Sequence, residues 1–76
     1  MKNTAEIIAF GINLRRLREK RNLSQQQLAD ISDVSKITIQ RIENAKFVVK
    51  LDVLISIAKG LEIELKDLLD FKEQSF

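Results

Sequence analysis

The segment from residue 25 to residue 46, QQQLADISDVSKITIQRIENAK, restricts the possible folds more than any other part of the chain. Its apolar residues recur at helical spacing in two short runs, which predicts two helices separated by a turn. Asp33 falls in this turn, where a short polar side chain tolerates a left-handed backbone. Ser35 stands where its hydroxyl can cap the second helix. The residues that point away from the apolar face of that helix are Lys36, Ile37, Gln40 and Arg41.

A short exposed helix with these side chains can enter the major groove of DNA. There Arg41 or Lys36 can donate to guanine, Gln40 can pair with adenine, and Ile37 can pack on a thymine methyl group. Simpler interpretations remain open, because Arg41 can instead form a salt bridge with an acidic neighbour and Gln40 can be an ordinary surface residue.

Helical spacing of apolar residues also continues outside this segment. In total it predicts five helices, at residues 4–21, 25–31, 35–44, 51–59 and 64–71. A glycine inside a helix costs about 1 kcal/mol relative to alanine, so Gly11 indicates a neighbouring helix that packs closely. Gly60 is expected to end the fourth helix. The residues expected to face inward on that helix are Leu51, Leu54, Ile55 and Ala58.

Composition excludes several classes of protein. The chain has 76 residues, enough for one domain whose core we expect at about residues 7–71. It has no cysteine, histidine or proline, so disulfides are excluded, and zinc or nucleophilic chemistry lacks its usual residues. We therefore expect no enzyme, no metal, no cofactor and no small-molecule ligand. No apolar run approaches the roughly 20 residues of a membrane span, so we expect a cytoplasmic protein.

Charge is divided unevenly along the chain. Residues 1–50 hold ten Lys and Arg against five Asp and Glu, whereas residues 51–76 hold three against six. This asymmetry predicts one side that faces DNA and another that is turned away from phosphate, although chance clustering on solvated helices would look the same. Four C-terminal carboxylates could hold a hard cation loosely, but a solvated acidic face is the simpler interpretation. They are Glu62, Glu64, Asp67 and Asp70.

Residues 10–69 resemble the phage-repressor and Cro-like (XRE) helix-turn-helix domain. The resemblance is carried by INLRRLREKRNLSQQQLA, DVSKITIQRIENAK and LDVLISIAKGLEIELKDLL, in the family's order and spacing. It implies an all-α, five-helix, lambda-repressor-like domain with its helix-turn-helix at the second and third helices. It also implies a sequence-specific regulator, in the simplest case a repressor, that binds double-stranded DNA.

The resemblance further implies roles for individual residues. Base edges would be read by Lys36, Ile37, Gln40 and Arg41. Phosphates would be held by Gln25, Ser35, Asn44 and Lys46. A buried structural ion pair would join Arg18 to Glu43. Family members commonly have glycine where this chain has Asp33 and Ala45. Because Ala45 disfavours a left-handed backbone, we expect the loop at residues 45–50 to differ in shape from the family.

Two modes of action remain open. In the first, a homodimer formed through the fifth helix and C-terminal residues such as Phe71 or Phe76 reads a palindrome with half-sites about 34 Å apart. Lys66, close to Glu62 and Asp70, would make such a contact self-complementary. In the second, the same fold serves as an antitoxin or protein-binding adaptor. The apolar segment at residues 47–49 either tucks under the domain or meets a partner, and its exposure would favour this alternative. The few residues after the fifth helix argue against a toxin-wrapping tail.

Overall fold

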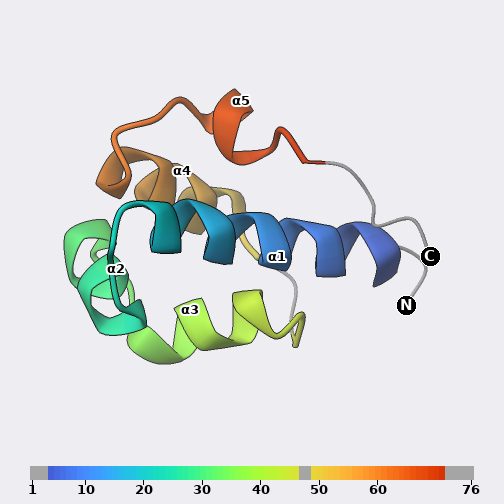
Figure 1. The fold of residues 1–76 in the computed structure, drawn as a ribbon, viewed down its shortest axis with the longest axis horizontal. Helices are drawn as coiled ribbons and strands as arrows, with labels where there is room; N and C mark the ends of the chain where they lie inside the picture. Colours follow the sequence, from blue (N-terminus) through green and yellow to red (C-terminus); the bar gives the residue numbers. More distant parts are fainter. Residues whose placement is uncertain (1–3, 47–48, 72–76) are drawn as a thin grey trace.

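The computed structural model describes residues 4–46 and 49–71, and within these ranges the chain forms five α-helices and no strand (Figure 1). Their bounds are α1 Thr4–Lys20, α2 Gln25–Ser32, α3 Lys36–Glu43, α4 Leu51–Gly60 and α5 Leu65–Leu68. The predicted all-α class and helix order are confirmed. The first four helices end within one residue of the predicted positions, whereas α5 is a single turn of four residues.

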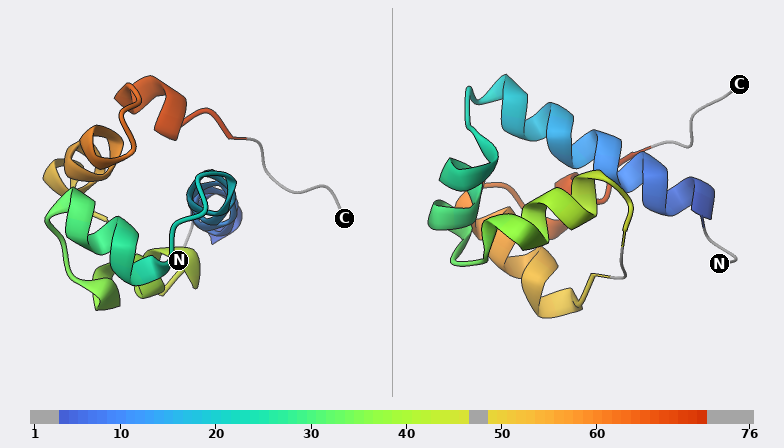
Figure 2. Two further views of the ribbon diagram at one scale, coloured as in Figure 1. Left: turned by 60° about the vertical axis from the view of Figure 1, so that its left-hand side comes forward. Right: turned by 90° about the horizontal axis from the view of Figure 1, so that it is seen from below.

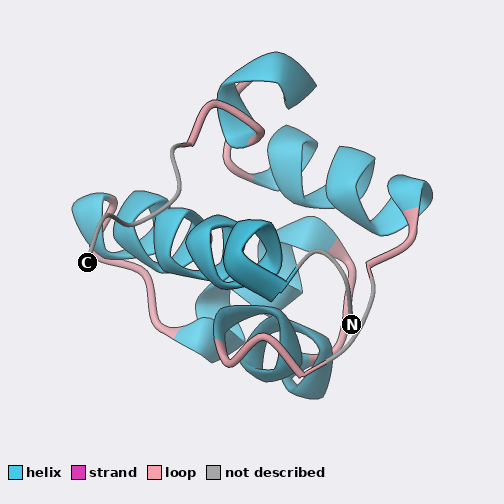
Figure 3. Cartoon of the chain, turned by 90° about the vertical axis from the view of Figure 1, so that its right-hand side faces the viewer, coloured by secondary structure: helices cyan, strands magenta, loops and turns pink. Residues whose placement is uncertain are grey.

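The helices enclose one core. α1 runs through the middle of the domain, with α3 on one side of it and α4 and α5 on the other (Figure 1 and Figure 3). α2 contacts both α3 and α4, α1 contacts α3, and α4 contacts α5. In Figure 1, α3 lies along the lower edge of the domain and α5 lies at the upper edge. The side-chain amide of Asn13 donates to the carbonyl of Leu68 at 3.1 Å and so ties α1 to α5.

Apolar side chains from every helix meet in the core. The largest fully buried side chains are Leu14, Leu28, Ile39, Ile42, Ile57, Leu61 and Leu68. Phe10 adds an aromatic contact with Phe71, with ring centroids 5.7 Å apart. Leu28, Ile39 and Ile42 place the apolar face of the helix-turn-helix in this core, and Val34 is half-buried against it.

The predicted inward face of α4 is partly wrong. Leu51 is 62% exposed and Ile55 is 37% exposed, whereas Ile57 is fully buried. Ala58 is buried as expected. The polar residues of α4 share one side of the helix and are Asp52, Ser56 and Lys59. The buried residues lie opposite them, so Leu51 and Ile55 fall at the margin of the apolar face.

Four helices end in the same way, with a non-glycine residue in the left-handed region. These residues are Asn22, Asp33, Ala45 and Glu62, with φ between 55° and 57°. The side chains of asparagine and aspartate tolerate this conformation, whereas those of alanine and glutamate do not favour it. The prediction that Asp33 sits in a turn of this kind is confirmed.

Ala45 takes the left-handed conformation that we expected it to resist. The N–H of Lys46 donates to the Arg41 carbonyl at 2.8 Å, and the N–H of Ala45 donates to the Ile42 carbonyl at 3.1 Å. These two bonds form a Schellman motif that ends α3. The expectation of a different loop shape is therefore wrong at the start of the loop.

Both glycines lie inside helices, where neighbouring backbones approach. A Cβ on Gly11 would lie 2.5 Å from the Ile42 carbonyl oxygen, so the predicted close packing on α1 is confirmed. A Cβ on Gly60 would collide with the side chain of Ser32 at the end of α2. Gly60 is thus the last residue of α4 and not its left-handed stop, which is Glu62.

Replacing Ala45 by glycine is expected to stabilise the domain by about 0.5–1 kcal/mol. Glycine removes the penalty that alanine has in the left-handed conformation, roughly 1–2 kcal/mol. It also raises the entropy of the unfolded chain, which destabilises the fold by about 0.5–1 kcal/mol. Urea unfolding of the two proteins measures the difference. As the control, Arg16→Gly on the exposed side of α1 should destabilise by about 1 kcal/mol. A loss of stability in Ala45→Gly would contradict the assigned backbone.

Candidate nucleic-acid interface

The outer face of α3 carries polar and charged side chains. Ile39 and Ile42 anchor the helix in the core, whereas Lys36, Ile37 and Arg41 are exposed. Figure 2 shows α3 from below, where it lies in front of α1 with no other helix over it. The four residues expected to read bases, which include the half-buried Gln40, therefore belong to one accessible helix.

α3 is held at its first turn by Ser35. The Ser35 hydroxyl accepts the N–H of Thr38 at 3.1 Å and lies 2.8 Å from the Thr38 hydroxyl oxygen. These contacts make Ser35 the N-cap of α3, as the sequence predicted. The cap fixes the residue at which α3 begins. The Ser35 side chain remains exposed at this end of the helix.

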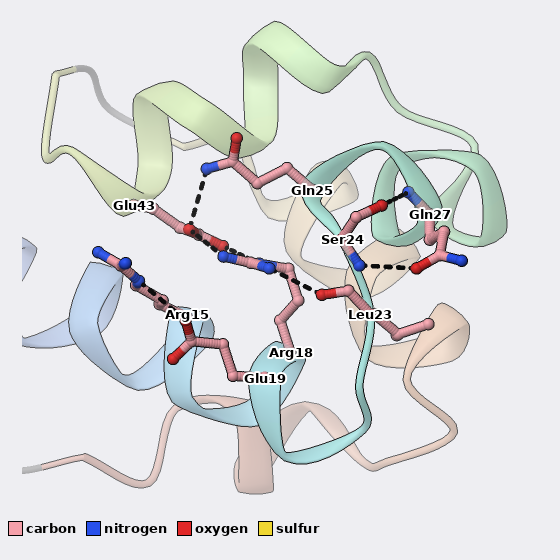
Figure 4. A network of polar contacts seen from close by, with 8 residues as sticks. All are labelled: Arg15, Arg18, Glu19, Leu23, Ser24, Gln25, Gln27 and Glu43. Atoms are coloured by element: carbon pink, nitrogen blue, oxygen red, sulfur yellow. Dashed lines mark hydrogen bonds and ion pairs between the residues drawn. The ribbon is translucent and has the colours of Figure 1, made fainter.

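A buried ion pair joins α1 to the end of α3 (Figure 4). Nε and Nη2 of Arg18 donate to the two carboxylate oxygens of Glu43 at 2.7 and 3.0 Å. The side chains are only 10% and 3% exposed. Hydrogen bonding to Glu43 raises the pKa of Arg18 above its ordinary value, against the opposing effect of burial. The remaining Nη1 donates to the Leu23 carbonyl at 2.7 Å.

Gln25 belongs to the same network. Its side-chain nitrogen donates to Oε1 of Glu43 at 3.1 Å, so the first residue of α2 is tied to the last residue of α3. The start of α2 is formed by a capping box, in which Ser24 accepts the N–H of Gln27 and the Gln27 side chain accepts the N–H of Ser24. Figure 4 shows both arrangements side by side. An amide nitrogen has two hydrogens, so one remains for another acceptor.

Three of the four residues expected to contact phosphate therefore lie near the end of α3. Gln25 is hydrogen-bonded to Glu43, and Asn44 and Lys46 follow Glu43 within three residues. Asn44 and Lys46 are both exposed. Ser35 lies at the other end of α3.

Among the described residues, the positive side chains near α3 are not neutralised by carboxylates. In the described part of the chain, Lys36, Arg41 and Lys46 have no ion-pair partner, so the salt-bridge alternative for Arg41 is not found there. α5 lies across the domain from α3 (Figure 1). The division between a basic and an acidic side stays a prediction.

Lys66 pairs with Glu64 at 3.5 Å, and both side chains are exposed. The role of Lys66, with Glu62 and Asp70, in a self-complementary contact between two copies stays a prediction. Phe71 packs on Phe10 within its own chain, and Phe76 lies outside the described residues.

The apolar segment that favoured a protein-binding adaptor is only partly described. Val49 is half-buried and packs against the core, so of the two alternatives this residue follows the one in which the segment tucks under the domain. Phe47 and Val48 lie outside the described residues. In the described ranges, no group of three or more acidic residues is arranged to hold a metal ion. No helix there is both long and apolar enough to cross a membrane.

Comparison with known proteins gives one consistent result. The family HTH_3, described as helix-turn-helix, matches residues 14–68. The control protein C.BamHI of Bacillus amyloliquefaciens is 39% identical over 72 residues, which is 93% of this chain and 88% of that protein. The crystal structure of the restriction-modification controller protein C.AhdI from Aeromonas hydrophila superposes with a TM-score of 0.82 at 33% identity, covering 84% and 97% of the two chains. The clp gene regulator ClgR from Corynebacterium glutamicum has a TM-score of 0.77 at 26% identity, covering 84% and 68%.

Proposed function

Because the chain belongs to the helix-turn-helix family HTH_3 and is a DNA-binding transcriptional regulator, we propose that it binds a palindromic operator as a homodimer, with α3 in the major groove. The observation that carries this proposal is the exposed face of α3, whose cations have no acidic partner among the described residues. When it is bound to this operator, the protein represses transcription by occluding the promoter.

Each side chain on α3 has a distinct role in this proposal. Lys36 and Arg41 donate to guanine, and Gln40 pairs with adenine. The free hydrogen of the Gln25 amide and the side chains of Asn44 and Lys46 hold phosphates at the end of α3. Ser35 holds a phosphate at the beginning of α3.

The second copy would pack against the α4–α5 side of the domain. Leu51 and Ile55 are exposed one turn apart on α4, and Leu69 is 43% exposed just after α5. α4 and α5 contact each other, so these side chains belong to neighbouring elements. Mixed charges near them, from Lys66 and Asp67, suit a surface that must complement itself.

Selection of duplexes from a randomised pool tests the dimer. We expect an inverted repeat with half-sites about 34 Å apart. Ile55→Asp should reduce the dimer fraction in sedimentation equilibrium and weaken binding to the full repeat. The control Ile31→Asp changes a comparably exposed isoleucine on α2 and should leave the dimer intact. Enrichment of a single half-site, bound by monomer, would contradict the proposed dimer.

The assignment of readers and phosphate contacts is tested by substitution. Gln40→Ala and Arg41→Ala should lose about 1–3 kcal/mol of discrimination at particular base pairs. Asn44→Ala and Gln25→Ala should weaken all duplexes alike, and Lys46→Ala should also lower the salt slope by about one. Titrations of the selected duplex and point-mutated duplexes at several salt concentrations measure these effects. Equal losses on every duplex for all five variants would refute the assignment.

A further inference from the structure

Ile37 is an unusual residue for the face on which it lies. It is the second residue of α3 and is 57% exposed, so the chain itself covers little of its side chain. The other outward residues of α3 are polar or charged. Ile37 has no hydrogen-bonding group, and apolar side chains gain free energy only where water is displaced by an apolar partner.

The partner of this face is a polyanion, as the charges of Lys36 and Arg41 indicate, because neither pairs with a carboxylate among the described residues. In the major groove nearly every base edge presents donors and acceptors, and the one apolar group is the C5 methyl of thymine. Against a polar edge, Ile37 would remove water from a base without offering a hydrogen bond in return. Residues at the N-terminal end of a recognition helix are those that contact base edges, and Ile37 lies there.

We propose that Ile37 binds the C5 methyl group of a pyrimidine in each half-site, so that operator affinity depends on this methyl group and not only on the base pair. This inference rests on the proposed function of α3 as the recognition helix. The methyl group is the same chemical group in thymine and in 5-methylcytosine. In an operator that carries cytosine at this position, C5 methylation of that cytosine therefore strengthens binding, so the regulator responds to methylation there.

The first experiment exchanges each thymine of the selected duplex, one at a time and in both half-sites, for uracil. Uracil lacks only the methyl group and keeps every hydrogen bond of the pair. At one position we expect wild-type affinity to fall about fourfold per methyl group, and about 15-fold when both half-sites are changed. Ile37→Ala should bind the thymine and uracil duplexes equally. Ile31→Ala, a similarly exposed isoleucine on α2, should retain the full difference.

The second experiment replaces that thymine by cytosine, with guanine opposite, and compares this duplex with its 5-methylcytosine form. We expect the methyl group to recover about fourfold in affinity per half-site for the wild type and nothing for Ile37→Ala. The intermediate variant Ile37→Val retains a branched apolar side chain and should keep part of the preference.

The outcomes separate this inference from the proposed function. Tight operator binding without any thymine whose methyl group matters would overturn the role of Ile37 and leave the function intact. The same would follow if Ile37→Ala kept the full uracil penalty. Absence of binding to every duplex by folded wild-type protein would overturn both.

Discussion

Replacing Glu43 by alanine is expected to lower the free energy of unfolding by about 3–5 kcal/mol, because it leaves the buried charge of Arg18 without its partner. Glu43 accepts hydrogen bonds from Arg18 and from Gln25, so one substitution disconnects α1 and α2 from the end of α3. A domain of this size has a total stability of only about 5–15 kcal/mol. Urea unfolding monitored by circular dichroism measures the loss.

Two further variants distinguish the charge from the packing. Glu43→Gln keeps the size of the side chain and one acceptor, and should lose less stability than Glu43→Ala. The double variant Arg18→Met and Glu43→Met removes both charges together and should recover most of the loss, since buried ion pairs contribute little over apolar residues. A Glu43→Ala protein within about 1 kcal/mol of the wild type would show that the ion pair is dispensable.

The contribution of the Arg18 guanidinium to stability should not change with pH near neutrality. The pKa of Arg18 is raised in the folded state, mainly because Glu43 accepts its hydrogen bonds. A raised pKa contributes stability that is complete below the unfolded-state pKa and is lost only as the pH rises through the folded-state pKa. For an arginine both values lie far above neutrality. The contribution of the guanidinium is therefore constant over physiological pH.

Gly11→Ala is expected to destabilise the domain by about 1–3 kcal/mol, although the same change in an open helix would stabilise it by about 1 kcal/mol. The new Cβ would lie 2.5 Å from the Ile42 carbonyl oxygen and 3.2 Å from that of Glu43. Both obstacles are backbone atoms, so no side-chain rotation relieves them and α1 must move away from α3. DNA affinity should fall as well, because this contact sets the position of the recognition helix.

Thermal unfolding and duplex titration of Gly11→Ala measure the two effects. A loss of this size corresponds to a fall of at least about 4 °C in Tm. Ile12→Ala, at the next and exposed position of α1, is the matched control and should stay within about 0.5 kcal/mol of the wild type. A rise in Tm for Gly11→Ala would mean that α1 and α3 are not in close contact.

Helix ends were predictable where the side chain itself forms the cap. Ser24, Gln27 and Ser35 carry their acceptors beside the N–H groups that they satisfy, so nearby sequence is sufficient. The left-handed positions were harder. Asn22 and Asp33 are recognisable from their side chains, but Ala45 and Glu62 have no local preference for this conformation. Their conformation follows from the Schellman bonds that end α3 and α4.

The sequence by itself determined the all-α class, the order of the helices and the residues on the outer face of α3, because these depend on spacing and capping within a few residues. Tertiary structure decided how far the buried face of α4 extends, since Leu51 and Ile55 lie at the margin of the apolar side and stay exposed when α4 contacts α2 and α5. It also decided the role of Gly60, which no local signal distinguishes from a helix stop. The bond from Gln25 to Glu43 likewise joins residues 18 positions apart, and only the packing of α2 on α3 brings them together.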